Sequence, residues 1–163
     1  MRNKRVLPMV QGALIAAMYV VLTLVANTFG LANGVIQVRF SEALTILPYF
    51  CEAAVPGLFV GCIISNTITG AAVWDIVFGS IATLAGAILT RKLRKLNKWL
   101  APLPPIVANT VVVPQVLRIV YGAPDSIWYL TVTVGIGEII SCGVLGMILL
   151  VALEKNAHRI FSE

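Results

Sequence analysis

The chain has few of the side chains on which most enzymes depend. Its single histidine, His158, lies in a charged tail beyond the last apolar stretch. A Ser-His hydrolase would lack its base and an HExxH metalloprotease would lack its ligands. The sequence contains no GxxxxGK[ST] loop for nucleotide phosphates. We therefore expect neither an enzyme nor a metal site or bound cofactor in this chain, and any uphill transport must be driven by an ion gradient or by another subunit.

Cysteine and charge are also scarce. Cys51, Cys62 and Cys142 fall in or beside apolar segments without CxxC spacing, which predicts small buried packing residues. Only 12% of the residues are charged, against about 25% in soluble domains, while 59% are hydrophobic. The chain is therefore predicted to be one integral membrane domain over residues 1–163. No basic patch is interleaved with exposed aromatic residues, so nucleic acid is not an expected partner.

The basic residues that are present predict a topology. Ten of the twelve lie in three clusters, at residues 2–5, 91–98 and 155–159. Basic residues that flank membrane spans collect on the cytoplasmic side. We therefore expect both termini and the loop at 90–99 to be cytoplasmic, in a multi-pass protein of the cell membrane.

The apolar blocks predict six helices. A span needs about 20 residues, so the block at 43–72 is too long for one helix and short for two. Two cytoplasmic clusters must be separated by an even number of crossings, which divides this block into two helices. Pro48, Glu52 and Pro56 mark the break. The prediction is an all-α membrane protein of six transmembrane helices, the second of them short, from the apolar blocks at 7–26, 43–72, 73–89, 101–121 and 127–153.

The remaining charged residues are the strongest candidates for a binding site. Alternate crossings place Arg39, Glu42, Asp75 and Arg118 at outer helix ends. Glu138 lies about eleven residues into the last helix, roughly halfway across the hydrocarbon at 1.5 Å per residue. An ionisable group at that depth costs at least about 2.5 kcal/mol, so it faces a cavity or a partner.

The neighbours of Glu138 favour a cavity, because three of the four residues on its helical face are small. The alternative is an internal salt bridge to Arg118 without a ligand. The residues of that face are Gly135, Ser141, Cys142 and Leu145.

Other polar and aromatic residues each allow two interpretations. Arg39 and Glu42 suit ligand contact or a local ion pair at a helix start, and Asp75 suits a ligand or a helix N-terminus. Asn66 and Asn109 can bind a ligand or join neighbouring helices. An interfacial aromatic belt accounts for Trp74, Trp128 and Tyr129 on the outer side and Trp99 on the inner side. The stacking surfaces available to a flat ligand are Trp74, Trp128, Tyr49 and Phe50.

Small residues four positions apart permit close helix packing. The first helix carries Ala13 and Ala17 with Gly12 and Ala16 beside them, and the third carries Gly57, Gly61 and Ser65. The partner helix of each face can belong to this chain or to another.

Five long strings resemble the QueT family, the queuosine-precursor substrate-binding (S) components of energy-coupling factor (ECF) transporters. They are VRFSEALTILPYF (38–50), AVPGLFVGCIISN (54–66), DIVFGSIATLAGAILTRKLRK (75–95), WLAPLPPIVANT (99–110) and VGIGEIISCGVLGMILL (134–150). The resemblance implies a six-helix S-component bundle that captures its ligand from outside. It also implies docking on an ECF module of one transmembrane subunit and two ATPases, which would use ATP and magnesium. Ala13 and Ala17 match the face that the family uses to meet the transmembrane subunit.

The family's inferred substrate is a 7-deazaguanine base such as 7-aminomethyl-7-deazaguanine or queuine. A carboxylate pairs bidentately with a guanine-like N1-H and amino group, and a second carboxylate can balance the amine. Glu138 and Glu42 are the predicted leading pair, with Asp75 third. The alternatives are a stand-alone proton-coupled transporter with Glu138 as relay, an S-component for another small vitamin-like heterocycle, and a purely structural subunit.

Overall fold

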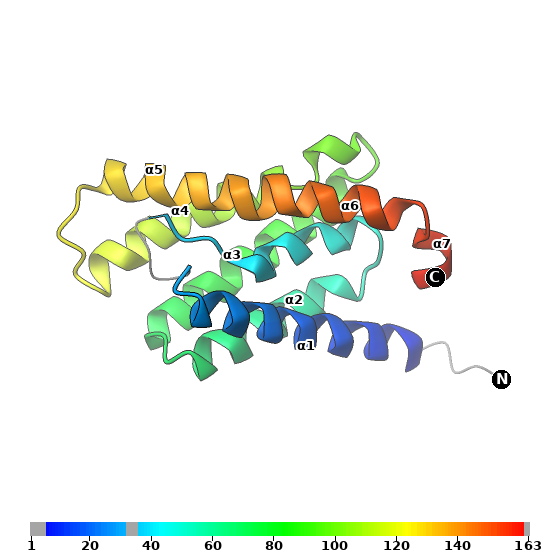
Figure 1. Cartoon of the computed structure of the whole chain (residues 1–163), viewed down its shortest axis with the longest axis horizontal. Helices are drawn as coiled ribbons and strands as arrows, with labels where there is room; N and C mark the ends of the chain where they lie inside the picture. The colour runs from blue at the N-terminus through cyan, green and yellow to red at the C-terminus, as the bar shows by residue number, and fades with distance from the viewer. Residues whose placement is uncertain (1–5, 32–35, 162–163) are drawn as a thin grey trace.

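The computed structural model describes residues 6–31 and 36–161. Arg2, Lys4 and Arg5 of the first basic cluster lie outside the described residues. Within these two ranges the chain forms helices and connecting turns without a strand (Figure 1). The elements are α1 (Val6–Thr28), η1 (Phe40–Tyr49), α2 (Ala54–Ile68), α3 (Val73–Leu93), η2 (Lys98–Leu100), α4 (Leu103–Ile119), α5 (Ile127–Glu138), η3 (Ile139–Leu145), α6 (Gly146–Glu154) and α7 (Ala157–Ile160).

The predicted division of the 43–72 block is confirmed. η1 ends at Tyr49 and α2 begins at Ala54, so the break falls at residues 50–53, between Pro48 and Pro56. α5, η3 and α6 follow one another directly, and together they make the sixth membrane helix. The six predicted helices are therefore all present as helical segments.

The second helix is short, as predicted, and it is a 3-10 helix of ten residues. At about 2.0 Å rise per residue it is roughly 20 Å long, less than the roughly 30 Å hydrocarbon core. All residues from Ser41 to Pro48 are buried, because α1, α2, α3, η3 and α6 all contact η1. η1 therefore lies in the middle of the molecule, as Figure 1 shows.

Four helices are long and apolar enough to cross a membrane, namely Val6–Thr28, Val73–Leu93, Lys98–Ile119 and Ile127–Glu154. α2 is apolar but has only 15 residues. Large apolar side chains such as Met9, Leu14 and Val73 are exposed on the outside of the bundle. In a bilayer this surface contacts acyl chains.

The two ends of the molecule differ. The start of α1, the break at 50–53, η2 and α7 lie at one end, here called the terminal end (Figure 1). Residues 36–39, 69–72 and 120–126 lie at the other, here called the loop end. The basic residues at 91–98 and Lys155 are therefore at the same end as the start of α1, which is the arrangement that the topology prediction requires.

Glycines decide how α1 packs against α2. A Cβ atom on Gly57 would lie 2.7 Å from the carbonyl oxygen of Gly12, and one on Gly61 would lie 3.1 Å from Cα of Ala16. Gly12 and Ala16 therefore face α2 within this chain. Ala13 and Ala17, on the neighbouring face of α1, are exposed.

Candidate functional site

A cavity of about 470 Å³ opens at the loop end, between α1, α2, α3, α4 and the segment that precedes η1. This volume is in the range of pockets that hold small organic ligands, roughly 300–1,000 Å³. The side chains that give the cavity its polarity come from the ends of helices and from the segments that connect them. They are Asn27, Gln37, Arg39, Asn66, Asp75 and Tyr121.

A cluster of buried polar groups lies beneath the cavity. Glu42 is 1% exposed, and both of its carboxylate oxygens accept hydrogen bonds from the protein. The Tyr19 hydroxyl donates to Oε1, and Nδ2 of Asn109 donates to Oε2 at 3.4 Å. The thiol of Cys142 donates to Oε2 of Glu138 at 3.3 Å. A buried polar group without such a partner would be costly, so these bonds stabilise the centre of the bundle.

Helical spacing explains why the cluster lies below the cavity. Thr23 and Val113 line the cavity, and Tyr19 and Asn109 each lie four residues earlier on helices that run toward the loop end. η1 runs away from the loop end, so Glu42 lies further from the cavity mouth than Arg39, which directly precedes η1. Three elements therefore each place one cluster residue about one turn below the cavity wall.

The cluster also contains the groups closest to a possible metal site. Ligand atoms of Glu42, Glu138 and Cys142 lie within 4.8 Å of one another. Both oxygens of Glu42 already accept hydrogen bonds, and the Cys142 thiol donates to Glu138 while accepting from Oγ1 of Thr45 at 3.4 Å. The atoms that could bind a metal are therefore already engaged in hydrogen bonds within the protein.

A close backbone contact positions Arg39 at the cavity wall. A Cβ atom on Gly137 would lie 2.1 Å from the carbonyl oxygen of Gln37, so only glycine fits at this point of α5. The backbone N–H of Arg39 donates to Oγ of Ser141 at 3.1 Å. The segment at 37–39 is thereby held against the last helix, and Nη2 of Arg39 donates to Oε1 of Gln37 at 3.3 Å.

The last helix changes geometry directly after Glu138. Residues Ile139–Leu145 form a π-helix, which contains the Ser141 and Cys142 side chains. Such turns are rare and are frequent at functional sites. Sequence periodicity alone did not predict this π-helix. Gly137, directly before Glu138, is the sequence feature that permits the close contact with Gln37.

Tyr121 joins two loops at the mouth of the cavity. Its hydroxyl donates to Oδ2 of Asp75 at 2.9 Å and accepts from the backbone N–H of Ala72 at 3.0 Å. Burial raises the pKa of the Tyr121 phenol above its ordinary value, and the hydrogen bond to Asp75 acts in the same direction. The phenol is therefore a donor at neutral pH. Sequence reasoning missed Tyr121, because nothing local distinguishes it from an interfacial tyrosine.

The structure brings together only part of the predicted site. Arg39, Asp75 and Asn66 line the cavity, whereas Glu42, Glu138 and Asn109 are buried below it. The remaining four predicted residues lie elsewhere. Arg118 is exposed on α4, Trp74 and Trp128 are 59% and 79% exposed, and Tyr49 lies at the terminal end of η1 with its ring edge-on to Phe50 at 5.2 Å.

Two alternative ion pairs are not formed. Glu138 is buried against Cys142 while Arg118 is exposed, and no salt bridge joins them in the described ranges. Arg39 and Glu42 also form no salt bridge there, since the guanidinium donates to Gln37 and the carboxylate binds Tyr19 and Asn109. Neither pair is therefore joined by a salt bridge among the described residues.

Comparison with known proteins agrees with this architecture. The family model described as QueT transporter matches residues 9–155. The queuosine precursor transporter QueT of Lactococcus lactis subsp. cremoris (strain MG1363) is 32% identical over 84 residues, which are 52% of this chain and 49% of that protein. The alignment thus spans about half the length of that relative. No solved structure is significantly similar. With four helices able to cross a membrane and a match over nearly its whole length, the chain is a multi-pass membrane protein that belongs to the QueT transporter family.

Proposed function

We propose that this protein is the substrate-binding S-component of an ECF transporter, and that it binds a queuosine precursor in the cavity at the loop end. The ligand would be a 7-deazaguanine base such as 7-aminomethyl-7-deazaguanine or queuine. The observation that carries the proposal is a small polar cavity, lined by Arg39, Asp75 and Asn66, in a member of a transporter family. The relative's name supports the class of ligand.

The cavity offers the hydrogen-bonding groups that such a base needs. The guanidinium of Arg39 can donate to a carbonyl oxygen, and the amide of Asn66 can both donate and accept. Asp75 can accept from N–H groups of the base or from a cationic amine. Glu42 and Glu138 would lie below the ligand in the buried cluster, without contacting it.

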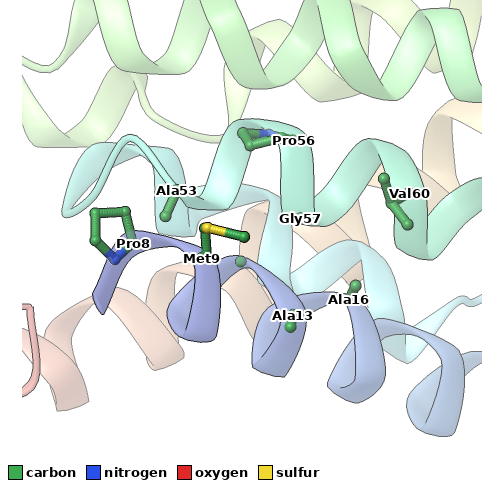
Figure 2. Close-up of a pocket in the computed structure, with 9 residues that line it drawn as sticks. Pro8, Met9, Ala13, Ala16, Ala53, Pro56, Gly57 and Val60 are labelled. Carbon is green, nitrogen blue, oxygen red and sulfur yellow. The ribbon is translucent and has the colours of Figure 1, made fainter. Parts of the chain in front are cut away.

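The exposed face of α1 supports docking on a transmembrane partner. Ala13 and Ala17 are exposed, since Gly12 and Ala16 are the residues that meet α2. Ala13 also lines an apolar groove of about 380 Å³ between α1 and α2. Figure 2 shows the side chains that line this groove. Small residues on an exposed face allow another helix to approach closely.

Ligand binding by the purified chain tests the proposal. We expect calorimetry in detergent to detect binding of 7-aminomethyl-7-deazaguanine or queuine. Arg39→Gln should abolish binding, whereas Arg118→Gln, which removes an exposed arginine outside the cavity, should leave it unchanged. Import into vesicles should require the ECF module and ATP. Import by the chain alone, sensitive to pH, would instead favour the proton-coupled transporter.

A further inference from the structure

We infer that Asp75, oriented by Tyr121, is the residue that distinguishes a cationic 7-deazaguanine from an uncharged one. This inference rests on the proposed function and assigns the recognition of a cationic substituent to the Asp75 side chain. It concerns the substituent of the base, not the purine-like ring.

Asp75 is the carboxylate that can reach a ligand in the cavity. Among the described residues it is the only acidic one that lines the cavity wall. Glu42 is 1% exposed with both oxygens hydrogen-bonded, and Glu138 is 6% exposed and bonded to Cys142. A ligand amine would have to displace internal donors to reach either of them. Asp75 is half-buried and needs no such displacement.

The hydrogen bonds of Asp75 leave one oxygen available. Oδ2 accepts from the Tyr121 hydroxyl at 2.9 Å. Oδ1 accepts no hydrogen bond within the described ranges. A Cβ atom on Gly79 would lie 3.7 Å from this oxygen and 3.5 Å from Nδ2 of Asn66. Oδ1 of Asp75 and the Asn66 amide therefore both lie near Gly79, on the same part of the α3 surface.

Tyr121 fixes the direction of the carboxylate. Its hydroxyl is itself held by the backbone N–H of Ala72 at 3.0 Å, so the donor that orients Oδ2 has a defined position. We therefore treat Tyr121 as a positioning residue, since it acts on the ligand through Asp75. Its loss should reduce discrimination between ligands more than it reduces binding of the ring.

The charges of the cavity fit a ligand that is positive at one end. Arg39 and Asp75 are its only charged lining residues among those the structure describes. Arg39 suits a carbonyl oxygen of the ring, which leaves Asp75 for the substituent. A hydrogen bond to a charged group is worth more than a neutral one, so an aminomethyl group should bind about ten- to hundred-fold more tightly than a cyano group.

Two bases that differ only in the substituent test this inference. Calorimetry with 7-aminomethyl-7-deazaguanine and 7-cyano-7-deazaguanine gives a selectivity ratio for each variant. Asp75→Asn should weaken the aminomethyl base about ten- to hundred-fold while leaving the cyano base nearly unchanged. Tyr121→Phe should also lower the preference for the aminomethyl base over the cyano base, by a smaller factor. Asp125→Asn, which removes an exposed acidic residue of the same end, is the matched control and should not change the ratio.

Each other outcome is decisive. Equal weakening of both bases by Asp75→Asn, in a variant with the wild-type melting temperature, would mean that Asp75 binds the ring or shapes the cavity, and the inference would be wrong. An unchanged ratio would also overturn it. If the wild-type chain bound neither base, this assignment would be wrong, and if it also failed to bind queuine, the proposed function itself would fail.

Discussion

At the scale of single residues, burial separates the acidic side chains into two groups. Glu42 and Glu138 are enclosed by protein donors, while Asp75 lines the cavity with one oxygen bonded to Tyr121. Carboxylates in a membrane interior are stable only when donors surround them. The hydrogen bond from Tyr19 to Glu42 is therefore expected to contribute to folding, independently of any ligand.

Tyr19→Phe tests this contribution. The change keeps the ring, which is 2% exposed, and removes only the hydroxyl that donates to Glu42. Leaving a buried polar group without its hydrogen-bond partner costs about 1–3 kcal/mol, so we expect a lower melting temperature in detergent. Tyr129→Phe is the control, because Tyr129 is 46% exposed and its hydroxyl has no partner in the described part of the chain. Equal melting of wild type and Tyr19→Phe would show that Glu42 does not depend on this donor.

At the scale of elements, the contact between the 37–39 segment and the last helix is the one that shapes the cavity. Gly137 permits the approach and Ser141 bonds to the backbone N–H of Arg39. The π-helix at Ile139–Leu145 begins just beyond this contact. The position of Arg39 in the cavity wall therefore depends on α5 and η3 as well as on η1.

Gly137→Ala is predicted to displace this segment. The added Cβ would lie 2.1 Å from the carbonyl oxygen of Gln37, so the backbone must move. Overpacking of this kind costs roughly 1–3 kcal/mol or more, and a displaced Arg39 should weaken ligand binding as well. Calorimetry and thermal melting measure the two effects.

Gly135→Ala in the same helix is the matched control. Its Cβ would meet Cγ2 of Thr110 at an ordinary 3.4 Å, and alanine favours helix by roughly 0.5–1 kcal/mol over glycine. It should therefore melt at the same temperature or slightly higher. Wild-type stability and affinity in Gly137→Ala would contradict the close contact.

At the scale of the whole molecule, the two ends carry separate tasks in the proposed function. The ligand cavity opens at the loop end, while the apolar groove between α1 and α2 lies at the terminal end. The basic loop at 91–98 shares the terminal end with Lys155. The assignment of that end to the cytoplasm stays a prediction from the charges.

Ala17→Leu should separate ligand binding from assembly. The added side chain would obstruct close approach of a partner helix at an exposed position of α1, so co-purification with the ECF module should weaken. Ligand affinity of the isolated chain should stay at the wild-type value, because Ala17 does not line the cavity. Ala152→Leu, at an exposed alanine of α6, should leave both properties unchanged. Normal assembly of Ala17→Leu would remove this face from the docking surface.

The helices themselves could be predicted from the sequence, because their signals are local. Apolar length defines the spans, and parity between the basic clusters, with Pro48 and Pro56, divides the block at 43–72 into two. Three of the five strings that resemble the QueT family, at 38–50, 54–66 and 75–95, each lie largely along one element. The depth of Glu138 follows from counting residues at a known rise per residue. Apart from the parity argument, which compares the clusters at 2–5 and 91–98, each of these properties depends on neighbours within about twenty residues.

Only the tertiary structure decided which side chains share the cavity. Arg118 and Trp128 lie at outer helix ends like Arg39 and Asp75, yet packing turns the first two outward and the last two inward. Glu42 does not line the cavity, because it belongs to the buried η1, where Tyr19 from α1 and Asn109 from α4 donate to it. Tyr121 meets Asp75 across 46 positions of chain. The rotation of each helix about its axis is set by contacts between elements distant in sequence, and no local pattern encodes it.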